Sequence, residues 1–382
     1  MIHFNKPYLT GKETHYIYDA VNSGKISGNG KYTQKCQTFF ESKYGFKKCL
    51  LTTSCTDALE MAAILANIKE GDEVIVPSFT FVSTAIAFIR QGAKIIFADS
   101  CIDNPNIDTN RIEELITDRT RAIVPVHYAG VACDMDKIME LAEKYKLLVI
   151  EDAAQAIDSF YIDKNGDKKA LGSIGHLAAF SFHETKNIIA GEGGMLTIND
   201  PQFINRAEII WEKGTNRAEF FRGEVNKYGW VDTGSSFLPS EIIAAFLWAQ
   251  IENIENIQAK RKHIWDWYYN EFKRLGIEKN LSKLPEYATN NAHMFYLKFE
   301  NLEDRTSFIE HSKKYNILSV FHYLSLHKSS FYESNNTERP ILVNSDFFTD
   351  GLVRLPLYYD LVDSDIKKIV KMVSDFMNRF NS

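Results

Sequence analysis

The chain contains 382 residues, 45% of them hydrophobic and 25% charged, and it carries a formal net charge of −6 at pH 7. This length leaves room for two domains with a sizeable core, and the composition is that of a soluble globular protein. The acidic balance argues against a nucleic-acid-binding protein, which normally has a basic excess.

Cysteine spacing and the length of apolar runs exclude further classes. The five cysteines show no CxxC spacing, so neither a disulfide framework nor a zinc site is predicted. The amino-terminal stretch lacks the basic run and apolar stretch of a signal peptide. No run approaches the roughly eighteen apolar residues that mark a membrane span. We therefore expect a cytoplasmic protein without membrane, nucleic-acid or metal partners.

Short apolar runs alternate with amphipathic stretches from about residue 50 to residue 200. Strands are predicted at 72–78, 93–99, 121–127 and 146–152, and helices at 56–68, 82–92 and 134–145. This alternation predicts a parallel sheet with right-handed crossovers, whose ligands bind at the carboxyl ends of the strands. Three polar residues stand at such predicted strand ends and indicate a site there: Asp99, His127 and Asp152.

The rest of the chain changes character. Residues 239–276 read as one long helical region, straight or bent, which is expected to link a large domain (1–250) to a smaller α+β domain (251–382). The smaller domain is predicted to contain strands at 293–300 and 317–323 and helices at 304–316 and 364–380. The polar stretch 163–169, with its Asn-Gly, predicts a surface hairpin or loop.

Lys186 and Asp152 suggest a specific chemistry. Asp152 closes the apolar strand of LLVIEDAAQ, and Lys186 lies in the small-residue turn of AFSFHETKNIIAGEGG. Pyridoxal 5′-phosphate needs an amine that forms an imine with its aldehyde and a carboxylate that keeps its ring nitrogen protonated. The two residues are candidates for these roles, although a lysine is usually a solvated surface charge and Asp152 has the alternative of capping a helix.

A phosphorylated cofactor also needs an anion site. In LLTTSCTDALEMAAILA, hydroxyl residues run into a predicted helix, whose N-terminus attracts anions; an ordinary N-cap is the alternative. An aromatic ring that stacks on the cofactor is expected from Phe79 or Phe81, with a core position as the commoner outcome. The other expected contacts come from the hydroxyls of Thr53, Ser54, Thr56 and Ser181 and from the amide of Gln155.

The stretches PSFTFVSTA, PVHYAG, VIEDAAQA, FSFHETKN and HYLSLH together resemble the nucleotide-sugar aminotransferases of the DegT/StrS family. The resemblance runs nearly end to end, from FNKPYLTGKE to RLPLYYDL. It implies the aspartate-aminotransferase-like fold type I of pyridoxal-phosphate enzymes. That fold has a mostly parallel central sheet with helices on both faces, plus a smaller C-terminal α+β domain.

The resemblance also implies roles for single residues. Lys186 matches the imine-forming lysine that moves the proton, Asp152 the partner of the pyridine nitrogen, and Gln155 the residue near the ring hydroxyl. The phosphate contacts would be Thr53, Ser54, Thr56 and Ser181, the stacking ring Phe81, and the substrate contacts His127, His183, His322, Lys213 and Arg217. A packed structural histidine is the alternative for His127 and His322, and a solvated basic face for Lys213 and Arg217.

The chain departs from the family where many members carry a GxNxR stretch whose Asn reaches the partner subunit's phosphate. Here the stretch is GSSFLPSE, which places Ser236 at about the Asn position and Leu238 at the Arg position. Ser236 is therefore the expected inter-subunit phosphate contact, in a homodimer with shared active sites.

The implied activity is transfer of an amino group from L-glutamate to C-4 of a keto-sugar nucleotide. The foremost substrate is dTDP-4-dehydro-6-deoxy-D-glucose, which would give dTDP-4-amino-4,6-dideoxy-D-galactose for surface polysaccharide. The alternatives are the gluco isomer, amination at C-3, or a pyridoxal-phosphate-binding regulator without catalysis. A dehydrogenase is disfavoured because no strand–GxGxxG–helix fingerprint is present.

Overall fold

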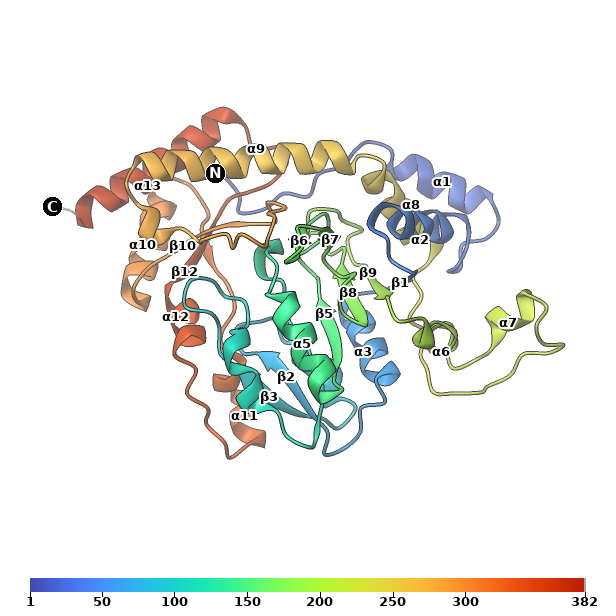
Figure 1. Ribbon diagram of the computed structural model, residues 1–382. Coiled ribbons are helices and arrows are strands. Elements are labelled where there is room, and N and C mark those ends of the chain that lie inside the picture. The colour runs from blue at the N-terminus through green and yellow to red at the C-terminus, as the bar shows by residue number, and fades with distance from the viewer. Residues whose placement is uncertain (381–382) are drawn as a thin grey trace.

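The computed structural model describes residues 1–380 and centres on one large sheet (Figure 1). Within these residues the sheet has seven strands in the order β1-β9-β8-β5-β4-β2-β3. All neighbours from β8 to β3 are parallel, and β9 is antiparallel to both of its neighbours. The predicted, mostly parallel sheet is therefore confirmed. Its strands are Lys48–Thr52 (β1), Glu73–Pro77 (β2), Lys94–Ala98 (β3), Thr120–Ile123 (β4), Leu148–Asp152 (β5), Leu177–Ser181 (β8) and Gly194–Ile198 (β9).

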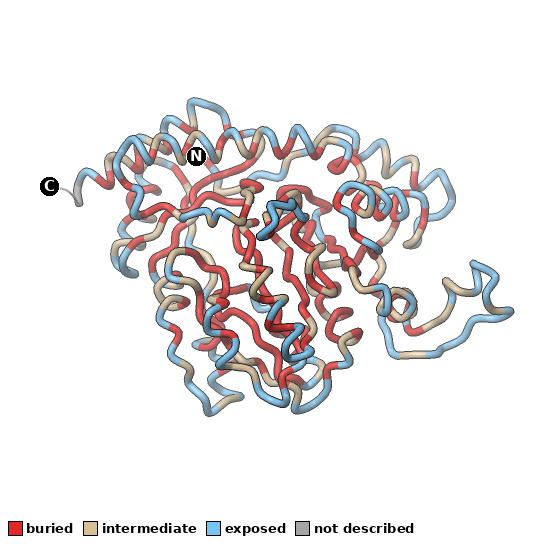
Figure 2. Tube along the Cα trace, viewed as in Figure 1, coloured by how far each residue is buried: buried red, intermediate tan, exposed pale blue. Residues whose placement is uncertain are grey.

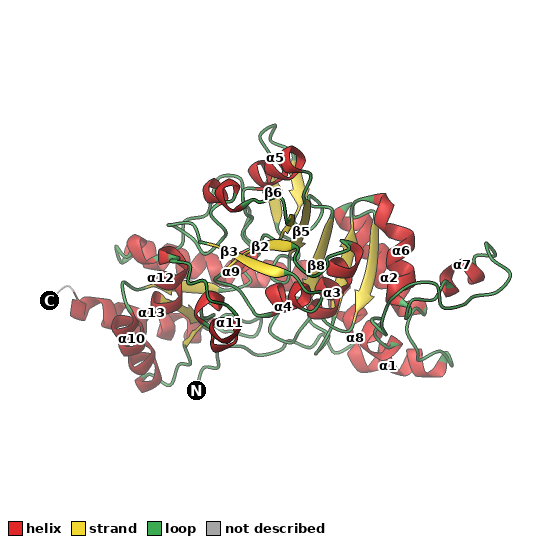
Figure 3. Ribbon diagram, turned by 90° about the horizontal axis from the view of Figure 1, so that it is seen from below, coloured by secondary structure: helices red, strands yellow, loops and turns green. Residues whose placement is uncertain are grey.

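Helices cover both faces of this sheet (Figure 3), because successive strand side chains point to opposite sides. Leu51 and Ile75 pack into one core cluster, whereas their neighbours Leu50 and Val74 pack into a second. The first cluster is closed by α2 (Lys31–Tyr44), α5 (Met135–Tyr145) and α8 (Glu241–Ile251); the second is closed by α3 (Cys55–Leu65), α4 (Ser83–Ile89) and α6 (Ile204–Trp211).

The predicted long helix at 239–276 is two helices. α8 ends at Ile251, and α9 (Ile254–Arg274) begins after a break at Glu252 and Asn253. α9 then runs along the top of the molecule toward the C-terminal elements (Figure 1). The predicted region is therefore helical on both sides of a bend, and the structure places that bend at Glu252 and Asn253.

The C-terminal elements form a second layered unit. An antiparallel sheet with the order β10-β12-β11 packs with α9, α10 and α13 around a separate core. Ile2, at the start of the chain, pairs with Ile317 and joins this core. The domain boundary at residue 250 stays a prediction. The remaining elements of this unit are Phe295–Lys298 (β10), Leu302–Lys314 (α10), Val320–Phe321 (β11), Val343–Gly351 (α12), Leu352–Leu355 (β12) and Asp363–Phe380 (α13), whereas Ser330–Asn335 (α11) packs through Tyr332 against the large sheet.

Two further features lie at the surface. The stretch 163–169 joins β6 (Phe160–Ile162) to β7 (Lys168–Ala170), which confirms the predicted hairpin. Beyond α6, the chain from 213 to 236 with α7 (Arg217–Phe221) projects from the body of the protein, past α1 (Glu13–Asn22), and we call it the arm (Figure 1). Figure 2 shows the arm as largely exposed, in contrast to the buried sheet.

Among residues 1–380, every helix falls short of the length and apolar character that crossing a bilayer requires.

Candidate active site

A cavity of about 500 Å³ lies where the carboxyl ends of β5 and β8 meet the start of α3 and the C-terminal unit. Asp152 and Ser181, the last residues of β5 and β8, line it together with Lys186. The opposite wall comes from residues far along the chain, among them His293, His322 and Arg354, and from Phe4 and Asn5 near its start. The predicted location at strand carboxyl ends is therefore occupied by a cavity.

Lys186 sits in the turn after β8, where its backbone N–H donates to the His183 carbonyl oxygen at 2.9 Å. Its amine has no ion pair or hydrogen bond with any residue in the described part of the chain. Burial lowers the pKa of this amine, and the charge of Arg354 acts in the same direction, while Cys55 and Asp152 oppose the shift. An unpaired amine with a lowered pKa is suited to nucleophilic chemistry.

Asp152 is fixed by two hydrogen bonds. Thr84 Oγ1 donates to one carboxylate oxygen at 2.7 Å, and the Ala154 N–H donates to the other at 3.1 Å. Burial raises the pKa of Asp152, and these hydrogen bonds and the charge of Lys186 partly offset that rise. The carboxylate keeps unused lone pairs toward the cavity, so it can accept a further N–H.

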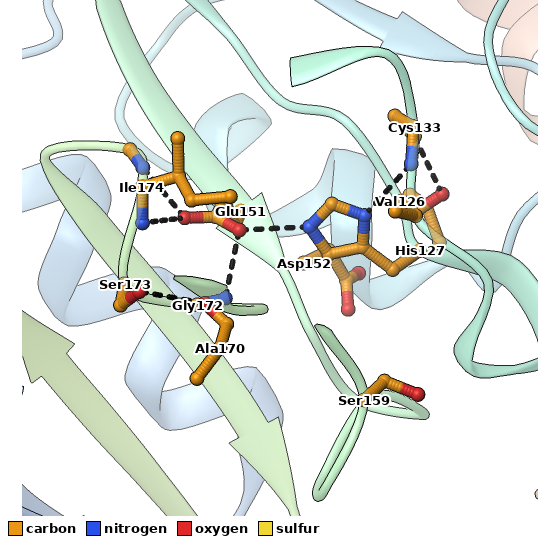
Figure 4. A network of polar contacts seen from close by, with 12 residues as sticks. Val126, His127, Cys133, Glu151, Asp152, Ser159, Ala170, Gly172, Ser173 and Ile174 are labelled. Atoms are coloured by element: carbon orange, nitrogen blue, oxygen red, sulfur yellow. Dashed lines mark hydrogen bonds and ion pairs between the residues drawn. The ribbon is translucent and has the colours of Figure 1, made fainter. Parts of the chain in front are cut away.

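His127 does not reach the cavity, and because β4 ends at Ile123 it lies four residues beyond the strand end at which it was predicted. Its side chain is fully buried; Nε2 lies 2.8 Å from Glu151 Oε2, and Nδ1 accepts from the Cys133 N–H at 3.2 Å (Figure 4). With both ring nitrogens engaged, His127 has no atom left for a substrate, and its alternative as a packed structural histidine is what the geometry supports. Asp99 likewise points away and accepts hydrogen bonds from Asn344 and Ser345 at the start of α12.

The start of α3, where the hydroxyl pattern predicts an anion site, lies at the cavity. Ser54 is the N-cap, accepting from the Asp57 N–H at 3.1 Å, so the ordinary N-cap alternative also holds for it. Ser54, Cys55 and Thr56 line the cavity, and the first N–H groups of the helix have no preceding turn to satisfy them. Thr53 is exposed outside this lining, where its hydroxyl pairs with Asp57.

Glycine at 194 makes this arrangement possible. A Cβ at Gly194 would lie 2.3 Å from the Ser54 carbonyl carbon. Only glycine therefore lets the first residue of β9 approach the helix N-terminus so closely.

The two candidate stacking rings, Phe79 and Phe81, lie in different environments. Phe79 is buried in a cluster with Tyr128, Tyr323 and Phe348, whereas Phe81 lines the cavity and is 55% exposed. Phe81 thus remains the candidate for stacking. Its ring centroid lies 6.0 Å from that of Tyr323 across the cavity lining.

Gln155 lines the cavity with its amide held at both ends. It accepts from the Ala129 N–H at 2.6 Å and donates to the Tyr323 hydroxyl at 3.0 Å. Tyr323 therefore connects Gln155 to the C-terminal wall.

Three histidines line the cavity, of which the sequence indicated His183 and His322. His322 Nδ1 lies 2.6 Å from the Tyr128 hydroxyl, and its ring stacks on Tyr323 with a centroid distance of 3.6 Å. His183 Nδ1 lies 2.9 Å from the Thr185 hydroxyl nearer the surface.

The third, His293, was missed, and the hydrogen-bond network assigns its tautomer. Asn187 donates through its side-chain nitrogen to Gln258 and to the Asn291 carbonyl oxygen, both at 2.8 Å. The Asn187 oxygen must then accept from His293 Nδ1 at 2.8 Å, which leaves His293 Nε2 as an acceptor. Burial lowers the pKa of His293 well below its ordinary value, so the ring is neutral.

Lys213, Arg217 and Ser236 lie outside the cavity of their own chain. All three are exposed and belong to the arm; Arg217 is 3.6 Å from Glu212. The structure therefore brings nine of the predicted site residues together at the cavity and leaves five outside it. The nine are Lys186, Asp152, Gln155, Ser181, Phe81, Ser54, Thr56, His183 and His322, and the five are Thr53, His127, Lys213, Arg217 and Ser236.

The lining residues fit pyridoxal phosphate. They offer an unpaired amine at Lys186, a carboxylate with spare lone pairs at Asp152, and an anion site at Ser54 and Thr56, all around one cavity. A carboxylate in the same cavity as the amine suits a protonated ring nitrogen, and the helix N-terminus suits a phosphate.

Comparison with known proteins agrees with this fit. Residues 7–374 match the model of the DegT/DnrJ/EryC1/StrS aminotransferase family. GDP-perosamine synthase of Caulobacter vibrioides is 32% identical, over 95% of both chains, and the spore coat polysaccharide biosynthesis protein SpsC of Bacillus subtilis is 29% identical, over 98% of this chain and 96% of its own. Among solved structures, the aminotransferase from Psychrobacter cryohalolentis superposes with a TM-score of 0.90 at 24% identity, covering 98% of this chain and 99% of its own, which shows the same fold.

Proposed function

The chain belongs to the DegT/DnrJ/EryC1/StrS aminotransferase family, and we propose that it moves an amino group from L-glutamate to C-4 of a keto-sugar nucleotide. It is a pyridoxal-phosphate-dependent sugar aminotransferase. The proposed substrate is dTDP-4-dehydro-6-deoxy-D-glucose and the proposed product dTDP-4-amino-4,6-dideoxy-D-galactose, a building block for surface polysaccharide. The observation that carries the proposal is the unpaired Lys186 amine, which shares one cavity with Asp152.

Each lining residue has a task in this proposal. When bound, pyridoxal phosphate supplies an aldehyde that takes up amino groups and a ring that withdraws electrons. Lys186 holds the cofactor between turnovers and then moves a proton at the substrate carbon, for which its lowered pKa suits it. Asp152, oriented by Thr84, stabilises positive charge on the ring nitrogen.

The phosphate and the ring are held by other residues. Ser54 and Thr56 at the start of α3, together with Ser181, bind the phosphate group, and Phe81 covers the ring. Gln155, whose amide is oriented by Ala129 and Tyr323, would contact the ring hydroxyl.

We propose further that two copies of the chain share their active sites. Ser236, Lys213 and Arg217 lie on the projecting arm and outside their own chain's cavity. In a homodimer the arm would reach the partner's cavity, where Ser236 would bind the cofactor phosphate and the two basic residues the nucleotide diphosphate.

NMR of the product tests the proposed reaction. The loaded protein is incubated with L-glutamate and dTDP-4-dehydro-6-deoxy-D-glucose. A new amine at C-4 with a small H3–H4 coupling is expected, because the galacto isomer carries this amine axially. A large coupling would replace the galacto assignment by the gluco isomer. Absence of any amino sugar would contradict this substrate and favour a 3-keto sugar nucleotide or a non-catalytic binding protein.

A further inference from the structure

His293, which lies just before β10, lines the cavity and keeps one ring nitrogen unused. Its Nδ1–H donates to Asn187 Oδ1 at 2.8 Å, so Nε2 carries a lone pair. This Nε2 has no hydrogen-bond partner in the described part of the chain. The neutral ring offers an acceptor at this nitrogen and nothing else. The ring therefore needs a hydrogen-bond donor from within the cavity.

Backbone hydrogen bonds hold residue 293 in place. Arg261 donates from Nε to the Ala292 carbonyl oxygen at 3.1 Å and from Nη2 to the His293 carbonyl oxygen at 2.7 Å. The His293 N–H donates to Asn291 Oδ1 at 3.0 Å. All of these residues are buried, and so is Asn187, which holds the ring. The direction of Nε2 is therefore set by the fold before any ligand binds, as an active-site acceptor requires.

Lys186 is the donor that this arrangement favours. Asn187 directly follows Lys186 in the chain, so the ring that it holds lies beside the turn that carries the amine. The Lys186 amine lines the same cavity and has no hydrogen bond to any residue from 1 to 380. Of the three cations that act on the His293 ring, Lys186 has the largest effect, ahead of Arg261 and Arg354. An unused acceptor and an unused donor thus share one cavity.

We propose that His293 is a positioning residue for Lys186: its Nε2 accepts a hydrogen bond from the Lys186 amine whenever that amine is not joined to the cofactor. The inference rests on the proposed function, because it gives a partner to the amine that the function uses. An amine that donates one N–H to a fixed acceptor loses rotational freedom about its last bond, so its lone pair keeps one direction for reaction and for proton transfer.

The bond also affects the charge of Lys186. A charged donor bonds more strongly than a neutral one, so His293 would stabilise the charged amine more than the neutral amine. It would therefore limit how far burial lowers the pKa of Lys186, as Cys55 and Asp152 also do, whereas Arg354 acts with burial. Loss of the acceptor is expected to lower this pKa further.

Two substitutions separate this role from a merely structural one. His293→Asn keeps a donor near the position of Nδ1 for Asn187 but removes the acceptor at Nε2. His293→Gln places an amide oxygen near the position of Nε2 and gives up the bond to Asn187. We expect the Gln variant to resemble the wild type and the Asn variant to be impaired. If circular dichroism shows that His293→Asn does not fold, His293→Leu takes its place.

The first measurement starts from cofactor-free protein. Pyridoxal phosphate is added, and the rate at which the imine absorbance rises is followed across pH. Because the neutral amine reacts, the midpoint of this rate follows the pKa of Lys186. The midpoint of His293→Asn is expected to lie lower than that of the wild type by about half a pH unit or more. The midpoint of His293→Gln is expected to match the wild type.

The second measurement uses L-glutamate and the keto-sugar nucleotide. In His293→Asn, kcat is expected to fall by about 10- to 100-fold because the amine is poorly aimed, with both KM values within about threefold of wild type. Glutamate deuterated at its α carbon should show a larger kinetic isotope effect in this variant than in the wild type, because proton transfer becomes slower. His293→Gln should restore both values.

His176 offers a matched control. It is a partly buried histidine whose Nδ1 accepts from the Val149 N–H at 3.0 Å, and it lies outside the cavity, toward the opposite end of β5. His176→Asn is expected to keep the wild-type midpoint and isotope effect.

The other outcomes are equally decisive. An impaired His293→Gln beside a normal His293→Asn would make the bond to Asn187 the important one and overturn the inference. A raised KM for the keto-sugar nucleotide with an unchanged midpoint would assign Nε2 to the substrate, which also overturns it. A midpoint that depends on His293, in a protein that aminates no keto-sugar nucleotide, would support the inference and contradict only the proposed reaction.

Discussion

At Lys186, burial and the lack of an acid paired with the amine in the described chain both favour the neutral amine. Removing the amine from water favours its neutral form, and no acid within hydrogen-bonding distance in the described chain restores the charge. The two effects leave a nucleophile in a cavity that also holds the carboxylate of Asp152. A lysine on the surface would be solvated and charged, and such an amine reacts poorly.

Lys186→Ala is expected to abolish turnover, with a decrease of at least 10³-fold, because no other amine lines the cavity among the described residues. The imine absorbance of the bound cofactor should disappear, whereas the circular dichroism spectrum should match that of the wild type. Activity and absorbance measured on the same preparation check this. Turnover near the wild-type level would show that Lys186 is not the reactive amine.

The lowered pKa of Lys186 also predicts a pH-dependent stability difference. A lysine whose pKa is depressed by folding costs free energy when its charge is buried. This cost is full below the folded pKa and disappears as the pH rises to the ordinary value near 10.5. Lys186→Met should therefore stabilise the cofactor-free protein more at pH 7 than at pH 10. Urea unfolding of both proteins at the two pH values measures this, and an equal difference at both would contradict the depressed pKa.

At the scale of elements, β5 connects the core to the site through two adjacent acids. Because strand side chains alternate, Asp152 faces the cavity and Glu151 faces the interior (Figure 4). The fully buried Glu151 carboxylate holds the turn between β7 and β8 and the side chain of His127 in the segment that follows β4. Its partners are the N–H groups of Gly172, Ile174 and Gly175, at 2.6–2.8 Å, and His127.

Glu151→Ala is expected to lower the free energy of unfolding by about 3–5 kcal/mol, because three backbone donors and His127 lose their acceptor in a buried place. Urea denaturation measures the change. Glu143→Ala, an exposed position on α5, is the control and should stay within about 0.5 kcal/mol of wild type. A loss below about 1 kcal/mol for Glu151→Ala would show that water replaces the carboxylate.

At the scale of the whole molecule, the arm exposes large apolar side chains to solvent when the chain is considered alone. Trp230 is 85% exposed and Phe221 70% exposed on a segment that projects from the body of the protein (Figure 2). Large apolar side chains gathered in this way mark a surface that binds another protein. The proposed occupant is a second copy of the chain, to whose cavity the arm would add the proposed phosphate contact of Ser236 and the proposed nucleotide contacts of Lys213 and Arg217.

We expect sedimentation analysis to show a dimer, and the double variant Phe221→Ser, Trp230→Ser to weaken it at least tenfold. Activity should fall with the dimer at low protein concentration, because each site needs the partner's arm. Ile341→Ser, at another highly exposed apolar position, is the control and should leave the dimer intact. A fully active monomer would contradict shared sites.

The local elements of this protein follow from its sequence. Apolar runs and helical periodicity placed β2 to β5 and α3 to α5 correctly. They do so because the spacing of apolar residues within a segment determines whether it forms a buried strand or an amphipathic helix. The same local logic put Asp152, Lys186 and Ser54 near strand ends and a helix start, where the cavity lies. The sequence pattern did not locate the break at Glu252 and Asn253, because neither residue is a strong helix breaker.

Which side chains face the cavity was decided by the tertiary structure alone. His127 and Asp152 both end a strand region, but only packing reveals that His127 is engaged by Glu151 and Cys133. Arg354 and His293 reach the cavity from the C-terminal unit, and no local pattern marks them, although Arg354 lies within the RLPLYYDL stretch that resembles the family. Sequence spacing determines what a residue can do within its own element, whereas contacts between segments more than a hundred residues apart depend on how the whole chain packs.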